Sequence, residues 1–308
     1  MNFRNKTQVR IFVLVGLTED RHLTLFLFIL FLLVYLVSIL ANCGMIALIH
    51  KTSRLQTPMY TFLSFLSLVD IFYSSVITPK MLADLISIVK TISFSGCAIQ
   101  FFFFAILAVS EALLLSAMSY DRYLAICHPL NYVSLMTKKK CVGLILVVMA
   151  VGSSQAIVQT TCVFTLEYCG PNVINHFFCD IPPLLKLSCS ETLQCDLIIF
   201  FFVSTCGAGS LMTILVSYTL IVLSILDMKT KKSRQKAFST CSSHLMCLTI
   251  FYGTIFFSYL RPTNQESGKQ DRVVAVLYTV VIPMINPLIY SLRNQEVKRV
   301  INQAFHRK

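Results

Sequence analysis

Seven long blocks of apolar residues constrain the fold of this chain more than any other feature. Crossing the hydrocarbon core of a bilayer takes about 20 consecutive apolar residues in a helix, because each residue adds about 1.5 Å. Every block is long enough, although the sixth begins with the polar stretch 239-STCSSH-244. The sequence therefore predicts an all-α membrane protein: one domain, residues 1–308, forming a seven-transmembrane helix bundle. The expected spans are about 25–49, 58–80, 97–121, 141–163, 197–226, 237–260 and 273–292.

Composition agrees with a membrane protein. Only 13% of the residues are charged and the mean hydropathy is +0.74, whereas a soluble domain carries about 25% charged residues. The first block begins after 24 residues, is too long for the core of a signal peptide and lacks a small-residue cleavage site. We therefore expect it to be retained as a span. No repeat of the length found in solenoids is visible.

The distribution of charge predicts the orientation. With the N-terminus (residues 1–24) outside, sixteen of the 26 Lys and Arg residues fall on inner segments and the other ten on outer ones. Because cytoplasmic loops are enriched in Lys and Arg, this distribution favours an outer N-terminus and an inner C-terminus. A glycosylation motif at Asn5 agrees with that orientation. The net charge of +12 suggests contact with anionic membrane lipids rather than with nucleic acid.

A charged pair, Asp121-Arg122, interrupts the apolar stretch 116-SAMSYDRYLAICHPL-130 at the inner end of the third span. By itself such a pair is equally consistent with an interfacial anchor, since long basic side chains at helix ends reach the water. The residues around it, however, match a signature. The chain resembles the class II olfactory receptors, a branch of the rhodopsin-like G-protein-coupled receptors. The resemblance rests on the residues around Asp121-Arg122 and on Asn42, 58-PMY-60, 68-LVD-70, 236-KAFSTCSSHL-245 and 283-PMINPLIYSLRN-294.

This resemblance covers almost the whole chain and implies a function. It implies a plasma-membrane receptor of olfactory cilia that binds a small-molecule odorant outside. Inside, it would activate a stimulatory, olfactory-type heterotrimeric G protein and raise cAMP, with no cofactor beyond a possible structural Na⁺. No nucleophile–base arrangement marks an enzyme. A transporter or channel is the alternative, but those proteins commonly show internal repeats and spans broken at the midplane in corresponding halves.

The resemblance also assigns residues to the switch that couples to the G protein. At rest we expect Asp121 to hold Arg122, because the basic run 229–236 offers no acid to do so. On activation Arg122 is expected to approach Tyr218. There is no Trp in the chain, and 251-FYG-253 stands in the sixth span as it does in olfactory receptors. The expected switch residues are Asp121, Arg122, Tyr123, Tyr218, Asn286, Pro287 and Tyr290.

Five of the twelve cysteines lie on the predicted outer side, where disulfides form, but their spacing does not fix the pairing. The resemblance pairs Cys97 with Cys179 and Cys169 with Cys189, which leaves Cys195 over. A metal site at His176, Cys179 and Asp180 is the alternative. It requires Cys179 to be a free thiolate.

Two acidic residues, Asp70 and Glu111, fall inside predicted spans, where a charge is costly and commonly functional. Asp70 is about 18 Å above the inner end of the second span, and Glu111 about 16 Å above Arg122, at the rise of an α-helix. We expect them to lie at the same depth and to share a cation or a proton. The resemblance suggests sodium; a neutral Glu111 bonded to Ser and Asn neighbours is the alternative.

The predicted ligand pocket lies in the outer half of the bundle. Phe104 is about 27 Å above Arg122, where amine receptors of the wider family carry an Asp. Without a counter-ion, the ligand is expected to be small, volatile, mostly apolar and neutral. About a third of the chosen residues are expected only to pack between helices. The expected lining is Phe104, Ala105, Ala108, Val109, Phe202, Cys206, Tyr252, Ile255, Tyr259, Val276 and Thr279.

The cytoplasmic tail, residues 293–308, carries apolar residues at helical spacing. Val297, Val300, Ile301, Ala304 and Phe305 share one stripe, and Lys298 and Arg299 lie off it. Such a pattern predicts a short amphipathic C-terminal helix on the inner leaflet. A solvated tail is the alternative.

Overall fold

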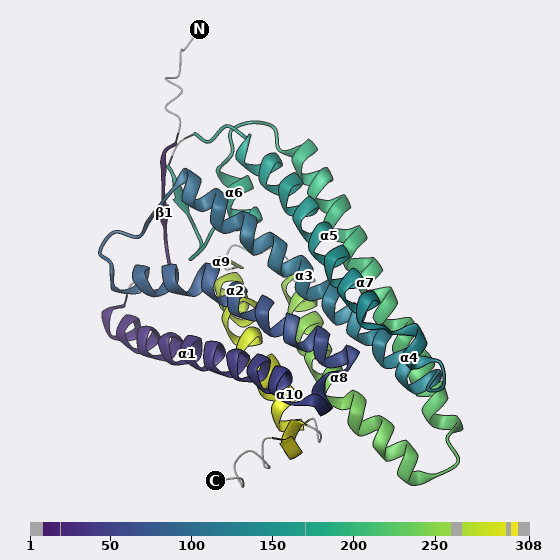
Figure 1. Cartoon of the computed structure of the whole chain (residues 1–308). Coiled ribbons are helices and arrows are strands. Elements are labelled where there is room, and N and C mark those ends of the chain that lie inside the picture. Colours follow the sequence, from purple (N-terminus) through teal and green to yellow (C-terminus); the bar gives the residue numbers. More distant parts are fainter. Residues whose placement is uncertain (1–8, 19, 170, 260–266, 294–296, 301–308) are drawn as a thin grey trace.

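The computed structural model is a bundle of long helices that follow the predicted blocks (Figure 1). It describes residues 9–18, 20–169, 171–259, 267–293 and 297–300. In chain order the long elements are α1 (Arg21–Lys51), α2 (Pro58–Ile86), α3 (Phe94–Cys127), α5 (Lys138–Phe164), α7 (Leu193–Asp227) and α8 (Lys231–Tyr259), followed by the last span as α9 (Ser267–Val276), η2 (Leu277–Val281) and α10 (Ile282–Arg293). Short helices η1 (Ser53–Leu55), α4 (Tyr132–Leu135) and α6 (Ile181–Leu187) lie in the connections.

Polar residues in the sequence explain where several helices begin. The Asp20 carboxylate accepts hydrogen bonds from the backbone N–H groups of His22 and Leu23, at 2.8 and 3.2 Å. The Ser93 hydroxyl accepts from the N–H of Gly96 at the start of α3. Such caps satisfy backbone donors that have no partner within the helix. Most helices extend a few residues beyond the predicted apolar blocks, because the polar ends of a span continue the helix into the interface.

Helix α3 occupies the centre of the bundle and packs against α2, α5 and α7. A glycine permits its close approach to α5: a Cβ at Gly152 would lie 2.9 Å from the Ser110 hydroxyl and 3.1 Å from the Ile106 carbonyl oxygen. On the other side, Asn42 of α1 donates to the Pro283 carbonyl oxygen at 2.9 Å. This bond joins the first span to the last and accounts for a buried amide in an otherwise apolar helix.

The seventh span contains a π-helical turn that the sequence analysis did not predict. Residues Leu277–Val281 form η2 between α9 and α10. Pro283 lies two residues after the end of η2 and has no N–H to donate to the carbonyl four residues earlier, so regular α-helical bonding is interrupted there. π-Helical turns of this kind are frequent at functional sites.

A small three-stranded sheet lies at one end of the bundle and departs from the all-α prediction. Strand β1 (Ile11–Leu14) pairs antiparallel with β2 (Thr91–Ser93) and parallel with β3 (Val173–Ile174), giving the order β2-β1-β3. Gly16, with a φ of 76°, turns the chain after β1, and its carbonyl accepts a hydrogen bond from Arg272 at 2.8 Å. The N-terminal segment is therefore held to both of its neighbouring loops and to α9 (Figure 1).

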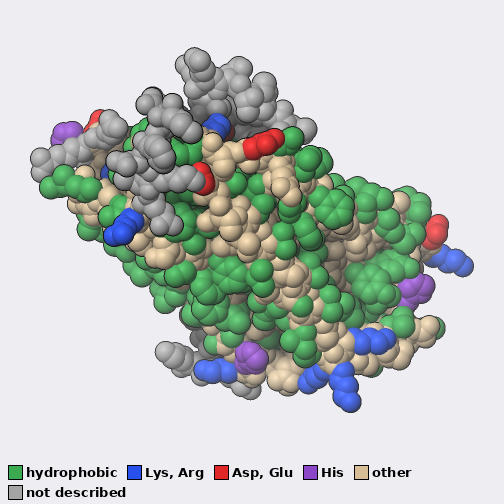
Figure 2. Space-filling view, turned by 90° about the horizontal axis from the view of Figure 1, so that it is seen from above, with side chains coloured by type: hydrophobic (Ala, Val, Ile, Leu, Met, Phe, Trp, Pro, Cys, Tyr) green, Lys and Arg blue, Asp and Glu red, His purple; other side chains and the backbone are tan. Residues whose placement is uncertain are grey.

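The outer surface of the helices suits a lipid environment. Large apolar side chains are exposed along α1 and α7, among them Phe26 at 61% and Phe200 at 71%. Figure 2 shows a face dominated by hydrophobic side chains, with charged groups mostly near its edges. Six described helices are long and apolar enough to cross a membrane, while the apolar part of α8 is shorter, Cys241–Phe256. This agrees with the polar start noted for the sixth block.

Of the predicted amphipathic tail, the structure describes only residues 297–300, which are helical. Val297 is buried, whereas Lys298 and Arg299 are exposed, as the predicted stripe requires. Ile301, Ala304 and Phe305 lie outside the described residues, and so does the glycosylation motif at Asn5.

Candidate functional site: an outer aromatic cluster, a buried acidic pair and an inner switch

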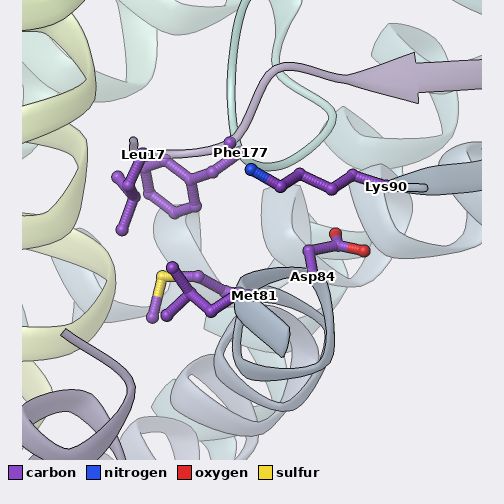
Figure 3. A pocket seen from close by; sticks show the side chains of 7 residues that line it. Leu17, Met81, Asp84, Lys90 and Phe177 are labelled. Atoms are coloured by element: carbon purple, nitrogen blue, oxygen red, sulfur yellow. The ribbon is translucent and has the colours of Figure 1, made fainter. Parts of the chain in front are cut away.

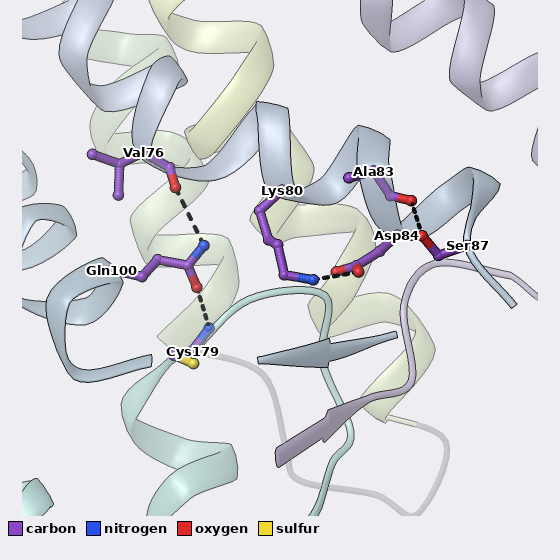
Figure 4. A network of polar contacts seen from close by, with 7 residues as sticks. All are labelled: Val76, Lys80, Ala83, Asp84, Ser87, Gln100 and Cys179. Carbon is purple, nitrogen blue, oxygen red and sulfur yellow. Dashed lines mark hydrogen bonds and ion pairs between the residues drawn. The ribbon is translucent and has the colours of Figure 1, made fainter. Parts of the chain in front are cut away.

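The outer loop after α5 is bonded to the top of α3. The predicted disulfide Cys97–Cys179 is present, with its two Cα atoms 5.6 Å apart. Next to it, the Gln100 side chain accepts a hydrogen bond from the Cys179 N–H and donates one to the Val76 carbonyl, which joins α3, the loop and α2 (Figure 4). The loop is therefore held against the outer part of α3 and, through Gln100, against α2.

Two further disulfides connect outer segments. Cys169–Cys189 is present as the resemblance implied. The prediction that Cys195 has no disulfide partner was wrong. Cys195 bonds to Cys162 near the outer end of α5. The error arose because Cys162 lies inside an apolar block and was counted among the buried cysteines of the spans.

The alternative metal site does not fit this geometry. Cys179 is bonded to Cys97 and cannot serve as a thiolate ligand. Burial, together with the nearby charge of Arg272, lowers the pKa of His176 to about 3, so the imidazole is neutral at physiological pH. It lies between the rings of Phe177 and Phe178. Within the described part of the chain, no group of three or more His, Cys, Asp or Glu residues could hold a metal ion.

Phe104 is the residue of the predicted pocket with the richest set of aromatic contacts. Its ring lies 5.7 Å from that of Tyr73 on α2, 5.1 Å from that of Phe178 in the outer loop and 6.4 Å from that of Tyr278 in η2, between ring centroids. The predicted residue thus meets three segments that are distant in sequence. Tyr73, Phe178 and Tyr278 were not among the predicted lining residues.

The other predicted α3 residues divide between two faces. Ala105 is 5% exposed and packs with Ile106 and Ala156 in a small cluster between α3 and α5, so its assignment to the pocket wall was wrong. Ala108 is partly buried against the main core, and Val109 is also half-buried. Successive residues of an α-helix are rotated by about 100°, which is why Ala105 leaves the face that Phe104 and Ala108 share.

On α7 and α8, one pair of hydroxyl groups stands out. Phe202, Cys206 and Ile255 are half-buried, as predicted wall residues should be. Tyr252 is bonded through its hydroxyl to Ser210 of α7 at 2.6 Å, and Ser210 donates to the Ala112 carbonyl of α3 at 2.9 Å. Ser210 was not predicted. The side chain of Tyr259 lies outside the described residues.

In the last span, Val276 is half-buried and packs against a core cluster that includes Phe178. Thr279 is fully buried, and its hydroxyl donates to the Ala275 carbonyl of its own helix at 2.7 Å. The neighbouring Tyr278 hydroxyl lies 3.4 Å from the Asp180 carboxylate. Burial raises the pKa of Asp180 above its ordinary value.

A small cavity lies farther out, away from the predicted pocket. It has a volume of about 10 Å³ and is lined by Gly16, Leu17, Met81, Asp84, Leu85, Lys90 and Phe177 (Figure 3). Asp84 is bonded through one carboxylate oxygen to Lys80 (Figure 4), while the other is buried and has no hydrogen-bond partner among the described residues. A volume of this size holds about one water molecule, so this cavity is too small for an odorant.

The two acids inside the membrane converge on one amide group. Asp70 of α2 and Glu111 of α3 are each 1% exposed. The Asn286 side chain of α10 donates to both Asp70 oxygens at 3.3 Å and to a Glu111 oxygen at 3.2 Å. The prediction that the two acids lie at one depth on neighbouring spans is confirmed. The sequence analysis had placed Asn286 in the switch and had not linked it to the acids.

At the inner end, Asp121 and Arg122 have partners other than each other. Both are buried. Asp121 accepts a hydrogen bond from Tyr132 of α4 at 2.8 Å, and the Arg122 Nε lies 2.9 Å from the Met59 sulfur. Within the described chain no ion pair joins Asp121 to Arg122, so the expected direct contact was wrong. Side chains of adjacent helical residues diverge, and α4 lies close enough to reach Asp121.

The remaining predicted switch residues lie on α3, α7 and α10. Tyr218 of α7 is bonded to His244 of α8 at 2.9 Å, and not to Arg122. Tyr123 is bonded to His128 at 3.0 Å, Tyr290 is fully buried and Pro287 lies within α10. His244 and Tyr132 were missed; the signal that could have found His244 is its place in 236-KAFSTCSSHL-245.

Comparison with known proteins places this geometry in a family. The family described as "Olfactory receptor" matches residues 31–308. Mouse olfactory receptor 5G25 is 50% identical over 308 residues, covering 100% of this chain and 97% of the relative. Human olfactory receptor 5AR1 is 47% identical, covering 100% of this chain and 99% of the relative. This chain belongs to the olfactory receptor family.

The fold of the receptor agrees with that assignment. Squid rhodopsin superimposes with a TM-score of 0.67 over 94% of this chain and 87% of rhodopsin, at 18% sequence identity. The seven-helix architecture is therefore shared where the sequences have diverged. The receptor is a multi-pass membrane protein of a G-protein-coupled family and not an enzyme.

Proposed function

We propose that this receptor binds small, volatile, mostly apolar and uncharged odorants in the outer half of the bundle. We further propose that binding activates a heterotrimeric G protein of the stimulatory, olfactory type and thereby raises cAMP. The observation that carries the proposal is the aromatic cluster around Phe104, which brings together rings from α2, α3, η2 and the outer loop. No predicted wall residue carries a charge.

The chemistry of this wall supports the proposed ligand class. Small-molecule sites are mainly apolar, with a few polar groups that fix the orientation of the ligand. Here those groups are hydroxyls, of which Tyr252 is the best placed because it links α7 and α8. A volatile ligand has few atoms with which to offset the entropy lost on binding, so modest affinity is expected.

The inner end supports coupling to a G protein. Arg122, Tyr218 and His244 come from three helices, α3, α7 and α8, and the Tyr218–His244 bond joins the last two. We propose that an agonist favours a state in which this bond opens, Arg122 turns towards Tyr218 and the inner ends of the three helices part to admit the tail of the G protein. An agonist achieves this only by binding that state more tightly.

We propose that the receptor resides in the plasma membrane of olfactory cilia, with its N-terminus outside. The excess of Lys and Arg on the opposite side supports this orientation. The two disulfides of the outer loop also support it, since an oxidising compartment favours them. In that orientation the motif at Asn5 is available for glycosylation.

We also propose that Asp70 and Glu111 share a sodium ion in the resting state. Two carboxylates that face one amide group within the membrane repel one another unless a cation or a proton compensates them. Carboxylate oxygens are suitable ligands for such a hard cation. Asp70 and Glu111 would hold the ion through their carboxylate oxygens, while the Asn286 amide donates to both acids.

Removing one of these acids is expected to change the equilibrium between the resting and active states more than it changes the contacts with the ligand. Asp70→Asn and Glu111→Gln should each shift the odorant dose–response curve and reduce its dependence on sodium, measured in cells at low and high external sodium. Asp227→Asn, which removes an exposed acid at the inner end of α7, is the control. Curves identical to the parent at both sodium concentrations would rule out a shared cation.

Filling the chamber, our name for the proposed ligand pocket around Phe104 and Ala108, is expected to block activation. Ala108→Phe places a ring one helical turn below Phe104 and should abolish most responses in a screen of diverse odorants with cAMP as the readout, without loss of receptor at the cell surface. Ala208→Phe makes the same change at an exposed position of α7 and should leave responses unchanged. An agonist that is permanently charged, or that is unaffected by Ala108→Phe, would place the binding site elsewhere.

A further inference from the structure

The hydroxyl pair between α7 and α8 has a defined direction. Ser210 donates its single proton to the Ala112 carbonyl oxygen, which cannot donate in return. The short contact between the Ser210 and Tyr252 hydroxyls, 2.6 Å, therefore requires Tyr252 to be the donor. Tyr252 of α8 therefore donates to Ser210 of α7, and Ser210 donates to the Ala112 carbonyl of α3.

This direction leaves one kind of hydrogen bond for a ligand. Ser210 is 2% exposed and out of reach, whereas Tyr252 is half-buried. The Tyr252 hydroxyl already donates its one hydrogen bond to Ser210. Its oxygen can therefore accept a hydrogen bond from a ligand, but the group cannot donate a second one. Ala112 is one helical turn from Ala108 on α3, so the pair borders the proposed chamber.

Other hydroxyl groups near the chamber are engaged in the same way. The Thr279 hydroxyl donates to the Ala275 carbonyl, and the Tyr278 hydroxyl donates to the Asp180 carboxylate. For the hydroxyl groups of Tyr252, Thr279 and Tyr278, the proton therefore already has an acceptor within the protein. A ligand that brings only an acceptor must break the existing bond of one of these three groups to receive a hydrogen bond from it.

We propose that the chamber selects odorants by hydrogen-bond polarity, preferring small alcohols and phenols, which donate to Tyr252, over ketones, esters and ethers of the same shape. This inference rests on the proposed function and names its ligand class. An alcohol adds a hydrogen bond to the existing chain, whereas a ketone takes the Tyr252 proton away from Ser210. The difference corresponds to one hydrogen bond, or about two- to tenfold in potency.

Matched alcohols and ketones provide the test. Cyclohexanol against cyclohexanone and menthol against menthone differ in hydrogen-bond polarity and little in shape. In cells expressing the full-length receptor, the alcohol of each active pair should have an EC50 about two- to tenfold lower in the cAMP assay. The readout is the EC50 of the ketone divided by the EC50 of the alcohol. A change in surface level or basal activity affects both ligands alike and leaves this ratio unchanged.

Two variants should move this ratio in a predictable way. Ser210→Ala removes the acceptor of the Tyr252 proton, which then becomes available to a ligand carbonyl; ketones should gain and the ratio should fall to about one or below. Tyr252→Phe removes the accepting oxygen, so that alcohols lose their advantage while ketones change little. Thr213→Ala is the matched control, because that α7 hydroxyl is exposed and bonded to the Gly209 carbonyl.

The outcomes separate this proposal from the proposed function. A parent receptor that prefers ketones, or a ratio unchanged by Ser210→Ala, would overturn the polarity selection and leave the odorant receptor intact. A receptor at normal surface level that responds to no alcohol, ketone or other neutral odorant would overturn both.

Discussion

Arg122→Ala is expected to abolish the cAMP response to any agonist while leaving most of the receptor at the cell surface. Arg122 is a buried charged group at the inner end of α3, and its guanidinium lies against Met59, with no ion pair to another described residue. Its loss therefore removes the group that is expected to approach Tyr218, without breaking a salt bridge that holds the fold. Signalling should fall to the level of untransfected cells, measured beside surface labelling.

Arg54→Ala is the matched control for this variant. Arg54 is an exposed arginine on the predicted cytoplasmic side, so its removal changes the charge of that side equally and should leave signalling near that of the parent. Full signalling by Arg122→Ala at normal surface level would contradict the proposed role of Arg122. The partner of Asp121 gives a second check: Tyr132→Phe should raise basal cAMP, because it removes the bond between α4 and α3.

Breaking the Cys97–Cys179 disulfide is expected to prevent delivery of the receptor to the cell surface. The bond closes a loop between residues 82 apart in the sequence, and removing a native disulfide typically costs about 2–5 kcal/mol of stability. The disulfide also fixes the position of the Cys179 N–H, which donates a hydrogen bond to Gln100. Gln100 in turn donates to the Val76 carbonyl and so connects the loop to α2. Cys97→Ser and Cys179→Ser should each reduce surface labelling to near background.

Cys43→Ser is the control for general effects of cysteine replacement, since Cys43 is free and exposed on α1. It should reach the surface normally. Mass mapping of surface receptor that found Cys97 and Cys179 both alkylated as free thiols would contradict this prediction. The same experiment should find Cys162 joined to Cys195.

The contrast between the disulfides shows how far the sequence could be followed. The family signature supplied two pairs, Cys97–Cys179 and Cys169–Cys189, and both are present. The third could not be found, because Cys162 lies in an apolar block and nothing local distinguishes a cysteine at the outer end of a span from one in its middle. Only the packing of α5 beside α7 brings Cys162 and Cys195 together.

The same limit applies to the binding and switch residues. Helical spacing puts Phe104 and Ala108 on one face of α3, whereas Ala105 lies against α5. The rings that surround Phe104 could not be predicted, because they come from the outer loop and η2, which are distant from Phe104 in the sequence. The direction of the Tyr252–Ser210 hydroxyl pair required the position of a carbonyl group on a third helix.

The sequence by itself determined the number and positions of the spans, the class of the receptor and the presence of two acids at one depth. These are properties of contiguous residues, since crossing the hydrocarbon core depends on length and hydropathy along the chain. The tertiary structure alone decided that an N-terminal strand joins two outer loops, that Asp121 bonds to Tyr132 and that Arg122 lies against Met59. The physical reason is that a side chain takes the partner that packing brings within reach, and helical spacing fixes only the direction in which it points.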